Sequence, residues 1–170
     1  MNDLLRYEWR LYFKSPMDYL KSRITREDNY LIWKYIYFLR REEGAKGKFG
    51  AYYYRRRKNT LGSRLGLQIY AGTCARGLHI WHYGSILISG DAVVGENCTF
   101  HGSACIGSDG ITAKAPKIGS HVDIGVGAKI IGDVTIADHV RIGAGAVVVR
   151  SCGTEGAVLI GVPAKSLAEP

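Results

Sequence analysis

The sequence predicts a parallel β-helix preceded by a small helical arm. Two observations carry this prediction: an apolar residue recurs every six positions through the later part of the chain, and charge and glycine are divided unevenly between the two parts. A period of six is three times the strand period of two, so these side chains share one side of an extended chain. It is not a multiple of the 3.6-residue helical period, which excludes a long amphipathic helix.

The repeat consists of large apolar anchors, each followed four places later by a mostly small residue. The anchors are Ile88, Val94, Phe100, Ile106, Ile118, Ile124, Ile130, Ile136, Ile142 and Val148. Short repeats form solenoids, because a single unit can bury its apolar face only by stacking on its neighbours. Three hexads make one triangular coil of about 18 residues, with the anchors expected inside it.

Two interruptions divide the repeat. Eight residues instead of six separate Ile80 from Ile88, and segment 108–117 keeps the count but has Thr112 where an anchor is expected. The first interruption predicts a bulge in the wall, and bulges re-aim side chains. The second predicts that segment 108–117 forms a loop instead of a regular part of the coil.

Composition divides the chain near residue 60. Residues 1–60 hold fifteen Lys and Arg against seven Asp and Glu, with only three of the 22 glycines. We therefore expect a helical, basic, aromatic-rich arm over 1–60 and the β-helix over 61–170. Cys74 and Cys98 occupy repeat positions for small apolar residues, so buried free thiols are expected, as suits a reducing cytoplasm. No apolar run approaches the ~20 residues of a membrane span, and the chain start lacks a signal peptide's apolar centre.

Two helices are expected in the arm. Asp28 is a candidate cap for an aromatic-rich helix over about 29–43, which stops at Gly44. Since apolar groups occur nearly all round this helix, it should be buried. An earlier helix is expected over about 3–13, ending before Pro16.

The basic run at 52–58, Tyr-Tyr-Tyr-Arg-Arg-Arg-Lys, has three readings. The first interpretation is a solvated connector whose aromatic rings pack on the first coil. The second is a surface that contacts an anionic membrane, and the third is a surface that contacts nucleic acid. No RNA- or DNA-binding motif accompanies the charge, so nucleic acid is not expected as a partner.

Among the histidines, His82 and His101 are the candidates for chemistry. His82 stands just before the two-residue slip, and counting along the repeat puts His101 one coil from Trp81 and His82. Gly84 and Gly102 leave the wall beside them bare. A neutral imidazole can accept a proton from an alcohol near pH 7.

His121 and His139 have a different prediction. They are 18 residues apart, so they are expected to stack on the outer surface of successive coils, about 4.8 Å apart. A solvated pair is the expectation, with a subunit-interface pair as the alternative.

The repeat resembles that of the hexapeptide-repeat acyltransferases. Segment 77–84 (Gly-Leu-His-Ile-Trp-His-Tyr-Gly) resembles a stretch of serine acetyltransferases. Together with Phe100-His101 and segment 114–117 (Lys-Ala-Pro-Lys), it resembles more closely their relatives encoded with capsule and exopolysaccharide synthesis. This resemblance implies an all-β left-handed parallel β-helix with a small α-helical N-terminal arm, an exception to the right-handed crossover rule. It also implies a homotrimer with active sites between neighbouring β-helices.

The resemblance further implies an acetyl-CoA-dependent O-acetyltransferase in which His82 is the general base. The chain departs from the serine enzymes in three places: Trp81 replaces the Asp before that His, Leu67 aligns with the Asp that orients it, and segment 114–117 lacks a second His. Because serine's ammonium needs carboxylates, a sugar hydroxyl in polysaccharide biosynthesis is the expected acceptor. His101 or a backbone carbonyl would then orient His82.

The cofactor expectations also follow from resemblance. Segment 161–165 (Gly-Val-Pro-Ala-Lys) is similar to the ending of many family members, where the cation lies near the CoA phosphates. By position, Val126 and Ala144 would bind the pantetheine arm, and Arg150 and Lys165 the phosphates. Lys and Arg pair strongly with phosphate. No metal is expected.

Three alternatives stay open beside a sugar O-acetyltransferase: a serine O-acetyltransferase, a non-catalytic β-helix for assembly or binding, and a zinc-dependent β-helical carbonic anhydrase. The last is disfavoured because the His-x4-His spacing of that family is absent. The expected location is the cytoplasm, with a peripheral contact of the basic arm at the inner membrane face.

Overall fold

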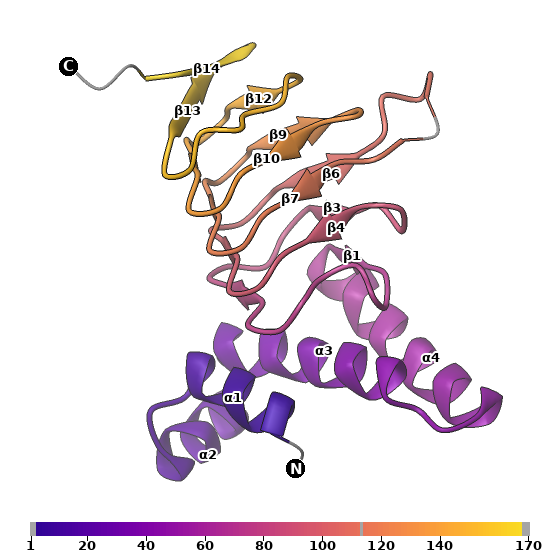
Figure 1. Ribbon diagram of the computed structural model, residues 1–170. Helices are drawn as coiled ribbons and strands as arrows, with labels where there is room; N and C mark the ends of the chain where they lie inside the picture. Colours follow the sequence, from indigo (N-terminus) through magenta and orange to yellow (C-terminus); the bar gives the residue numbers. More distant parts are fainter. Residues whose placement is uncertain (1–2, 113, 168–170) are drawn as a thin grey trace.

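The computed structural model describes residues 3–112 and 114–167 and shows a triangular column of short strands standing on a layer of helices (Figure 1). The helices are α1 (Asp3–Tyr12), α2 (Pro16–Thr25), α3 (Asp28–Glu43) and α4 (Lys48–Leu65). The strands are β1 (Leu67–Ile69), β2 (His79–Ile80), β3 (Ile86–Ile88), β4 (Val93–Val94), β5 (Thr99–Phe100), β6 (Cys105–Gly107), β7 (Lys117–Ile118), β8 (Asp123–Ile124), β9 (Lys129–Ile131), β10 (Thr135–Ile136), β11 (Arg141–Ile142), β12 (Val147–Val148), β13 (Val158–Gly161) and β14 (Ala164–Ser166).

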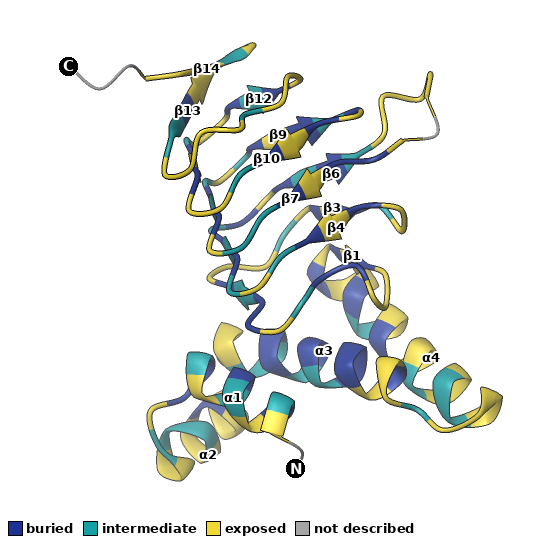
Figure 2. Ribbon diagram, in the orientation of Figure 1, coloured by how far each residue is buried: buried dark blue, intermediate teal, exposed yellow. Residues whose placement is uncertain are grey.

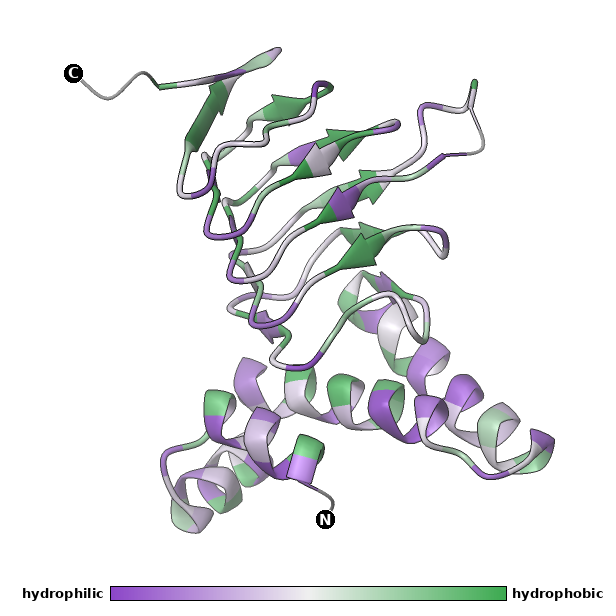
Figure 3. Ribbon diagram, in the orientation of Figure 1, coloured by the Kyte–Doolittle hydropathy of each residue, from purple (hydrophilic) through white to green (hydrophobic). Residues whose placement is uncertain are grey.

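The strands form the three sides of the column. One sheet has the order β1-β3-β6-β9-β12, the second β10-β7-β4, and the third β14-β13-β11-β8-β5-β2. Every pair is parallel except the closing hairpin β13–β14. The repeat anchors are all buried inside the column, where they form one continuous core with the helices. Figure 2 shows buried and exposed positions alternating along the column, with exposed residues also at its loops, and Figure 3 shows the apolar residues that recur along the strands.

Both interruptions of the repeat have the predicted consequence. Ile80 pairs with Phe100, 20 residues on instead of 18, so the wall between them takes up two extra residues. Val94 pairs with Ile118, 24 residues on. The six additional residues leave the column as the loop between β6 and β7, which projects from its side in Figure 1.

The arm is only partly as predicted. The two expected helices are present as α1 and α3, and Gly44 ends α3. Asp28 is not the cap of α3, however; Glu27 holds that position, and its side chain makes no capping hydrogen bond. Asp28 is instead the first residue of the helix.

Two further helices were not predicted. Pro16 does not only end the first helix; it opens α2 at the first helical position, where a missing N–H costs nothing, and the Ser15 side chain caps the helix. The basic run 52–58 is no connector; it lies within α4, which continues five residues beyond the expected boundary at residue 60. Gly66 ends α4 with φ of 70°, a conformation that favours glycine.

Helical side chains satisfy the open edge of the first coil. A solenoid end exposes strand N–H and C=O groups that would be unpaired when buried. The hydroxyl of Tyr12 on α1 accepts from Ile80 N–H at 3.0 Å and donates to the carbonyl of Leu78. The hydroxyl of Tyr35 on α3 accepts from Ile69 N–H at 2.9 Å. Lys58 on α4 donates to the Ile69 carbonyl at 2.9 Å, so three helices share the edge.

A buried ion pair completes this edge at the corner after Cys74. Arg40 donates to the carbonyls of Cys74 and Ala75 at 2.7 and 2.6 Å, and its guanidinium pairs with Glu8 at 2.8 Å. Glu8 also accepts from Gly77 N–H at 2.9 Å. Burial alone would lower the pKa of Arg40, but its hydrogen bonds and charge pairing, chiefly with Glu8, raise the pKa above its usual value. Arg40 therefore stays charged.

Replacing Arg40 by Met is expected to lower the free energy of unfolding by about 3–5 kcal/mol, because the Glu8 carboxylate would remain buried without its partner. Chemical denaturation measures this. Arg41→Met, on the same helix but exposed, is the matched control and should change the free energy of unfolding far less. Equal losses for the two variants would contradict the role given to Arg40.

Candidate active site

Three of the predicted site residues, His82, Val126 and Ala144, belong to one corner of the column. Ile80, Phe100, Ile124 and Ile142 are paired in register on successive coils. Two places after each of them stands a corner residue, and these are His82, Gly102, Val126 and Ala144. The corner residues therefore form a column of their own, one per coil, which we call the His82 column.

Contacts at Gly102 show how closely this column is packed. A methyl group placed on Gly102 would lie 3.6 Å from Cβ of His82 and 3.9 Å from Cγ2 of Val126. Gly102 also has φ of +134°, which L side chains rarely adopt. His82 below and Val126 above thus flank a position that carries no side chain.

His82 is exposed and lies close to the helical arm. Its side chain is 73% exposed, and Nδ1 is 3.9 Å from Oδ2 of Asp28 at the start of α3. Sequence reasoning missed this neighbour, because Asp28 lies 54 positions earlier in a segment without any repeat. The first turn of α3 therefore reaches the lowest level of the His82 column.

His101 is engaged by other partners. Its Nε2 lies 2.6 Å from Oδ1 of Asp123, and its ring stacks on Trp81 with 6.4 Å between centroids and 15° between planes. The prediction that His101 lies one coil from Trp81 is thus confirmed. No contact joins His101 to His82 among the described residues, so the structure gives no support to His101 as the group that orients His82.

Asp123 was also missed by sequence reasoning, although a signal for it exists. A count of 18 from Thr99 leads to Lys117, but the extruded loop raises the spacing at this level to 24 and brings Asp123 into register with Thr99. Adding the six loop residues to the count would have found the pair.

His79 is a structural residue. Its ring packs edge-on against Tyr12 and 4.9 Å from Trp81. Burial, and then the neighbouring His101, lower the pKa of His79 below its usual value. A neutral, partly covered ring between two aromatic side chains fits a packing role.

The predicted cofactor residues are divided between two corners. Val126, which is 51% exposed, and Ala144 are in the His82 column, and Gly145 N–H donates to the Val126 carbonyl at 2.8 Å. Lys165 lies on β14 opposite Ile160 of β13, next to the top of the same side. Arg150 follows β12 on the first sheet and is exposed, so the structure does not bring it to the His82 column.

The remaining histidines and the cysteines behave as expected. His121 and His139 are stacked with 4.8 Å between centroids and 5° between ring planes. Cys74 and Cys98 are buried free thiols, and burial raises their pKa to about 12 and about 11. Within residues 3–112 and 114–167, no three His, Cys, Asp or Glu side chains gather in a way that could hold a metal ion.

The chain is similar in structure to serine acetyltransferases. The enzyme of Neisseria gonorrhoeae matches with a TM-score of 0.73 and 24% identity over 97% of this chain and 65% of that one, and it has also been solved in complex with serine. The Brucella abortus enzyme in complex with coenzyme A gives 0.71 and 23% over 98% and 67%. Soybean serine acetyltransferase gives 0.70 and 19% over 98% and 70%.

These likenesses show the fold. The column is a left-handed parallel β-helix with an N-terminal helical arm, as the repeat and its resemblance predicted. The chain spans about two thirds of the length of these structures, from 65% of the Neisseria chain to 70% of the soybean chain. No protein-family model matches the sequence, and no curated protein matches it.

Proposed function

We propose that the protein is an acetyl-CoA-dependent O-acetyltransferase with His82 as general base. The observation that carries this proposal is the packing at Gly102: Cβ of the exposed residue His82 lies directly below a bare wall position, and the exposed Val126 lies above it. A slender acyl thioester can approach such a wall next to His82.

The reaction needs one proton acceptor at this place. Neutral His82 takes the proton of the acceptor hydroxyl as its oxygen attacks the thioester carbonyl. The tetrahedral intermediate then breaks its C–S bond, and the His82 imidazolium returns the proton to the leaving sulfur of CoA. General-base catalysis of this kind contributes roughly 10²–10⁴-fold.

The height of the β-helix beside the His82 column supports CoA as the acyl carrier. The row that stands one place before this column on each coil consists of His101, Gly125, Gly143 and Ile160, and Ile160 pairs with Lys165. Four strand spacings separate His101 from Lys165, or about 19 Å. This distance is of the order of the length of an extended pantetheine arm with its phosphates, so a thioester bound beside His82 would place its phosphates near Lys165. One of the similar solved structures, the Brucella abortus serine acetyltransferase, contains coenzyme A.

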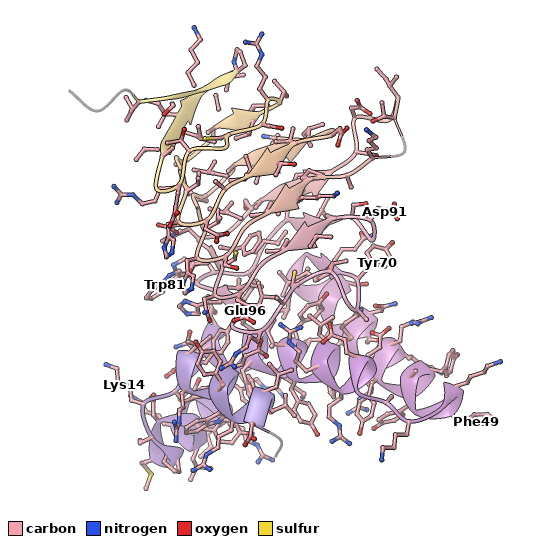
Figure 4. The ribbon with its side chains drawn as sticks, viewed as in Figure 1. Lys14, Phe49, Tyr70, Trp81, Asp91 and Glu96 are labelled. Atoms are coloured by element: carbon pink, nitrogen blue, oxygen red, sulfur yellow. The ribbon has the colours of Figure 1, made fainter. Side chains whose placement is uncertain are left out.

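A sugar hydroxyl is the acceptor we favour. Trp81 and Tyr83 stand on either side of His82 in the chain and are 51% and 38% exposed, and Trp81 projects from the column in Figure 4. Exposed aromatic rings beside a reactive group suit the apolar face of a pyranose. The second candidate is serine, because the similar structures are serine acetyltransferases and one holds serine.

We further propose a cytoplasmic homotrimer whose arm touches the inner membrane face. None of the described helices is long and apolar enough to cross a bilayer, so this contact would be peripheral. At the free end of α4, Phe49 is 94% exposed (Figure 4), and Tyr52, Arg56 and Arg57 follow it on the exposed surface. Each cation near anionic lipid contributes about 1 kcal/mol.

His82→Ala is expected to lower kcat by roughly 10²–10⁴-fold, since the proton acceptor is lost. CoA release is measured with acetyl-CoA and a panel of sugars, nucleotide sugars and serine. His139→Asn is the control, because this exposed residue lies on another corner at φ of 60°, where Asn is tolerated. Turnover with serine alone would establish the second candidate. Full turnover by His82→Ala would exclude His82 as the base, and no turnover with any acceptor would favour a non-catalytic β-helix.

Lys165→Ala is expected to weaken CoA binding by about fivefold, as an exposed cation paired with phosphate is worth up to about 1 kcal/mol. Calorimetry with CoA and with pantetheine, which lacks the phosphates, separates charge from shape. Only CoA binding should change, and Lys129→Ala on another sheet should change neither. An equal effect on both ligands would contradict the assignment.

Vesicle sedimentation tests the arm. At low salt the protein should bind vesicles with 30% anionic lipid, a proportion of about the order found on cytoplasmic membrane faces, and release them as salt screens the charges. Arg56→Gln with Arg57→Gln should reduce the bound fraction several-fold. Binding that is absent, or equal with neutral vesicles, would remove the membrane from the proposal.

A further inference from the structure

We infer that Asp28 is the positioning residue for His82: its carboxylate accepts from Nδ1–H and leaves Nε2 as the proton acceptor. This inference rests on the proposed function for its catalytic consequence, but the pairing itself is a property of the chain. It assigns part of the site to the helical arm, on an element that the repeat does not describe.

The first support is the geometry. Oδ2 of Asp28 is 3.9 Å from Nδ1 of His82, so the carboxylate faces that nitrogen. A hydrogen bond needs about 2.9 Å. Both side chains are more than half exposed, and small rotations or one bridging water would close the gap. Catalytic hydrogen bonds are often long without substrate and tighten in the complex.

The second support is that the carboxylate has no competing role. Glu27, rather than Asp28, is the cap of α3, and no other hydrogen bond or ion pair of the Asp28 side chain is found among residues 3–112 and 114–167. The backbone under Asp28 is nevertheless held firmly, because Ile32 and Ile36, one and two turns on, are fully buried. An unoccupied carboxylate on a fixed helix start is suited to orienting a neighbour.

The third support is that the other candidates do not engage His82. Among the described residues, the His82 ring makes no hydrogen bond to His101 or to a backbone carbonyl, and His101 is paired with Asp123 at 2.6 Å. Leu67, the residue aligned with the family's orienting Asp, is apolar and buried in the core. Within the described chain, Asp28 is thus the one acidic group within 4 Å of His82.

The chemical consequence concerns the two ring nitrogens. A carboxylate at Nδ1 selects the tautomer protonated there and keeps the lone pair on Nε2, on the opposite side of the ring. When Nε2 takes the acceptor's proton, the carboxylate also stabilises the imidazolium that forms. Asp28 itself exchanges no proton, so the balance of the reaction is unchanged.

Nuclear magnetic resonance of the ring nitrogens tests the pairing without any reaction. Long-range ¹H–¹⁵N spectra at alkaline pH report the tautomer of each histidine, and His82→Ala identifies the His82 signals. We expect the Nδ1-protonated form of His82 in the wild type, although free histidine prefers the other tautomer. Asp28→Asn should move the population towards Nε2–H, whereas Glu27→Gln, which removes a neighbouring carboxylate from the same helix start, should leave it unchanged.

Kinetics test the consequence. Asp28→Asn should lower kcat by about tenfold or more, with the acceptor KM changed less than about twofold, and Asp28→Glu should recover part of the loss. Thermal melting of each variant controls for folding, and Asp28→Ser replaces Asp28→Asn if the latter is unstable. A raised acceptor KM with unchanged kcat would mean that Asp28 binds the acceptor and would overturn the inference.

The two experiments separate this inference from the proposed function. A tautomer shift in a protein without turnover supports the pairing and counts against the acetyltransferase. Unchanged His82 nitrogen shifts in Asp28→Asn overturn the inference, whatever the turnover.

Discussion

The rest of the structure depends on closing the lower edge of the first coil. A parallel solenoid cannot end in the open, because its last strands present N–H and C=O groups with no next coil to receive them. Here the groups are met by buried side chains from three helices: Tyr12, Tyr35, Lys58 and the pair Glu8–Arg40. The charged pair is costly to bury unless every hydrogen bond is made, so arm and column must dock in one way.

That docking also sets the position of the site. The edge contacts of α1 fix the arm against β2, and those of α3 fix it against β1 and the corner after Cys74. The corner that follows β2 carries His82. Because the same packing holds α3, its first residue, Asp28, comes to 3.9 Å from the imidazole. The column above repeats the corner position at one residue per coil, so in the proposed function the base and the wall for the acyl carrier both derive from a single register. The helical arm is part of both the fold and the site.

The sequence predicted the parts of the structure that repeat. The anchors Ile80, Phe100 and Ile124 determine strand, coil and corner, and the counts across Ile80–Ile88 and 108–117 correctly predicted where the wall bulges and where a loop leaves it. Features outside the six-residue repeat were not predicted. Helices α2 and α4 were missed because their starts, at Pro16 and after Gly47, carry ambiguous sequence signals. The proximity of Asp28 to His82 was missed because the two residues are distant in the chain. Asp123 was missed because the inserted loop changed the count.

In the proposed function, the His82 column is one continuous track from the base to the end that binds the phosphates of CoA. A crystal structure of the protein with coenzyme A would show this track directly. We expect the thiol sulfur beside Gly102, about the length of an acyl group from the His82 ring, so that a bound acceptor reaches attack distance. The phosphates should lie towards Lys165. A CoA bound on another face, or with its thiol turned away from His82, would rule the track out.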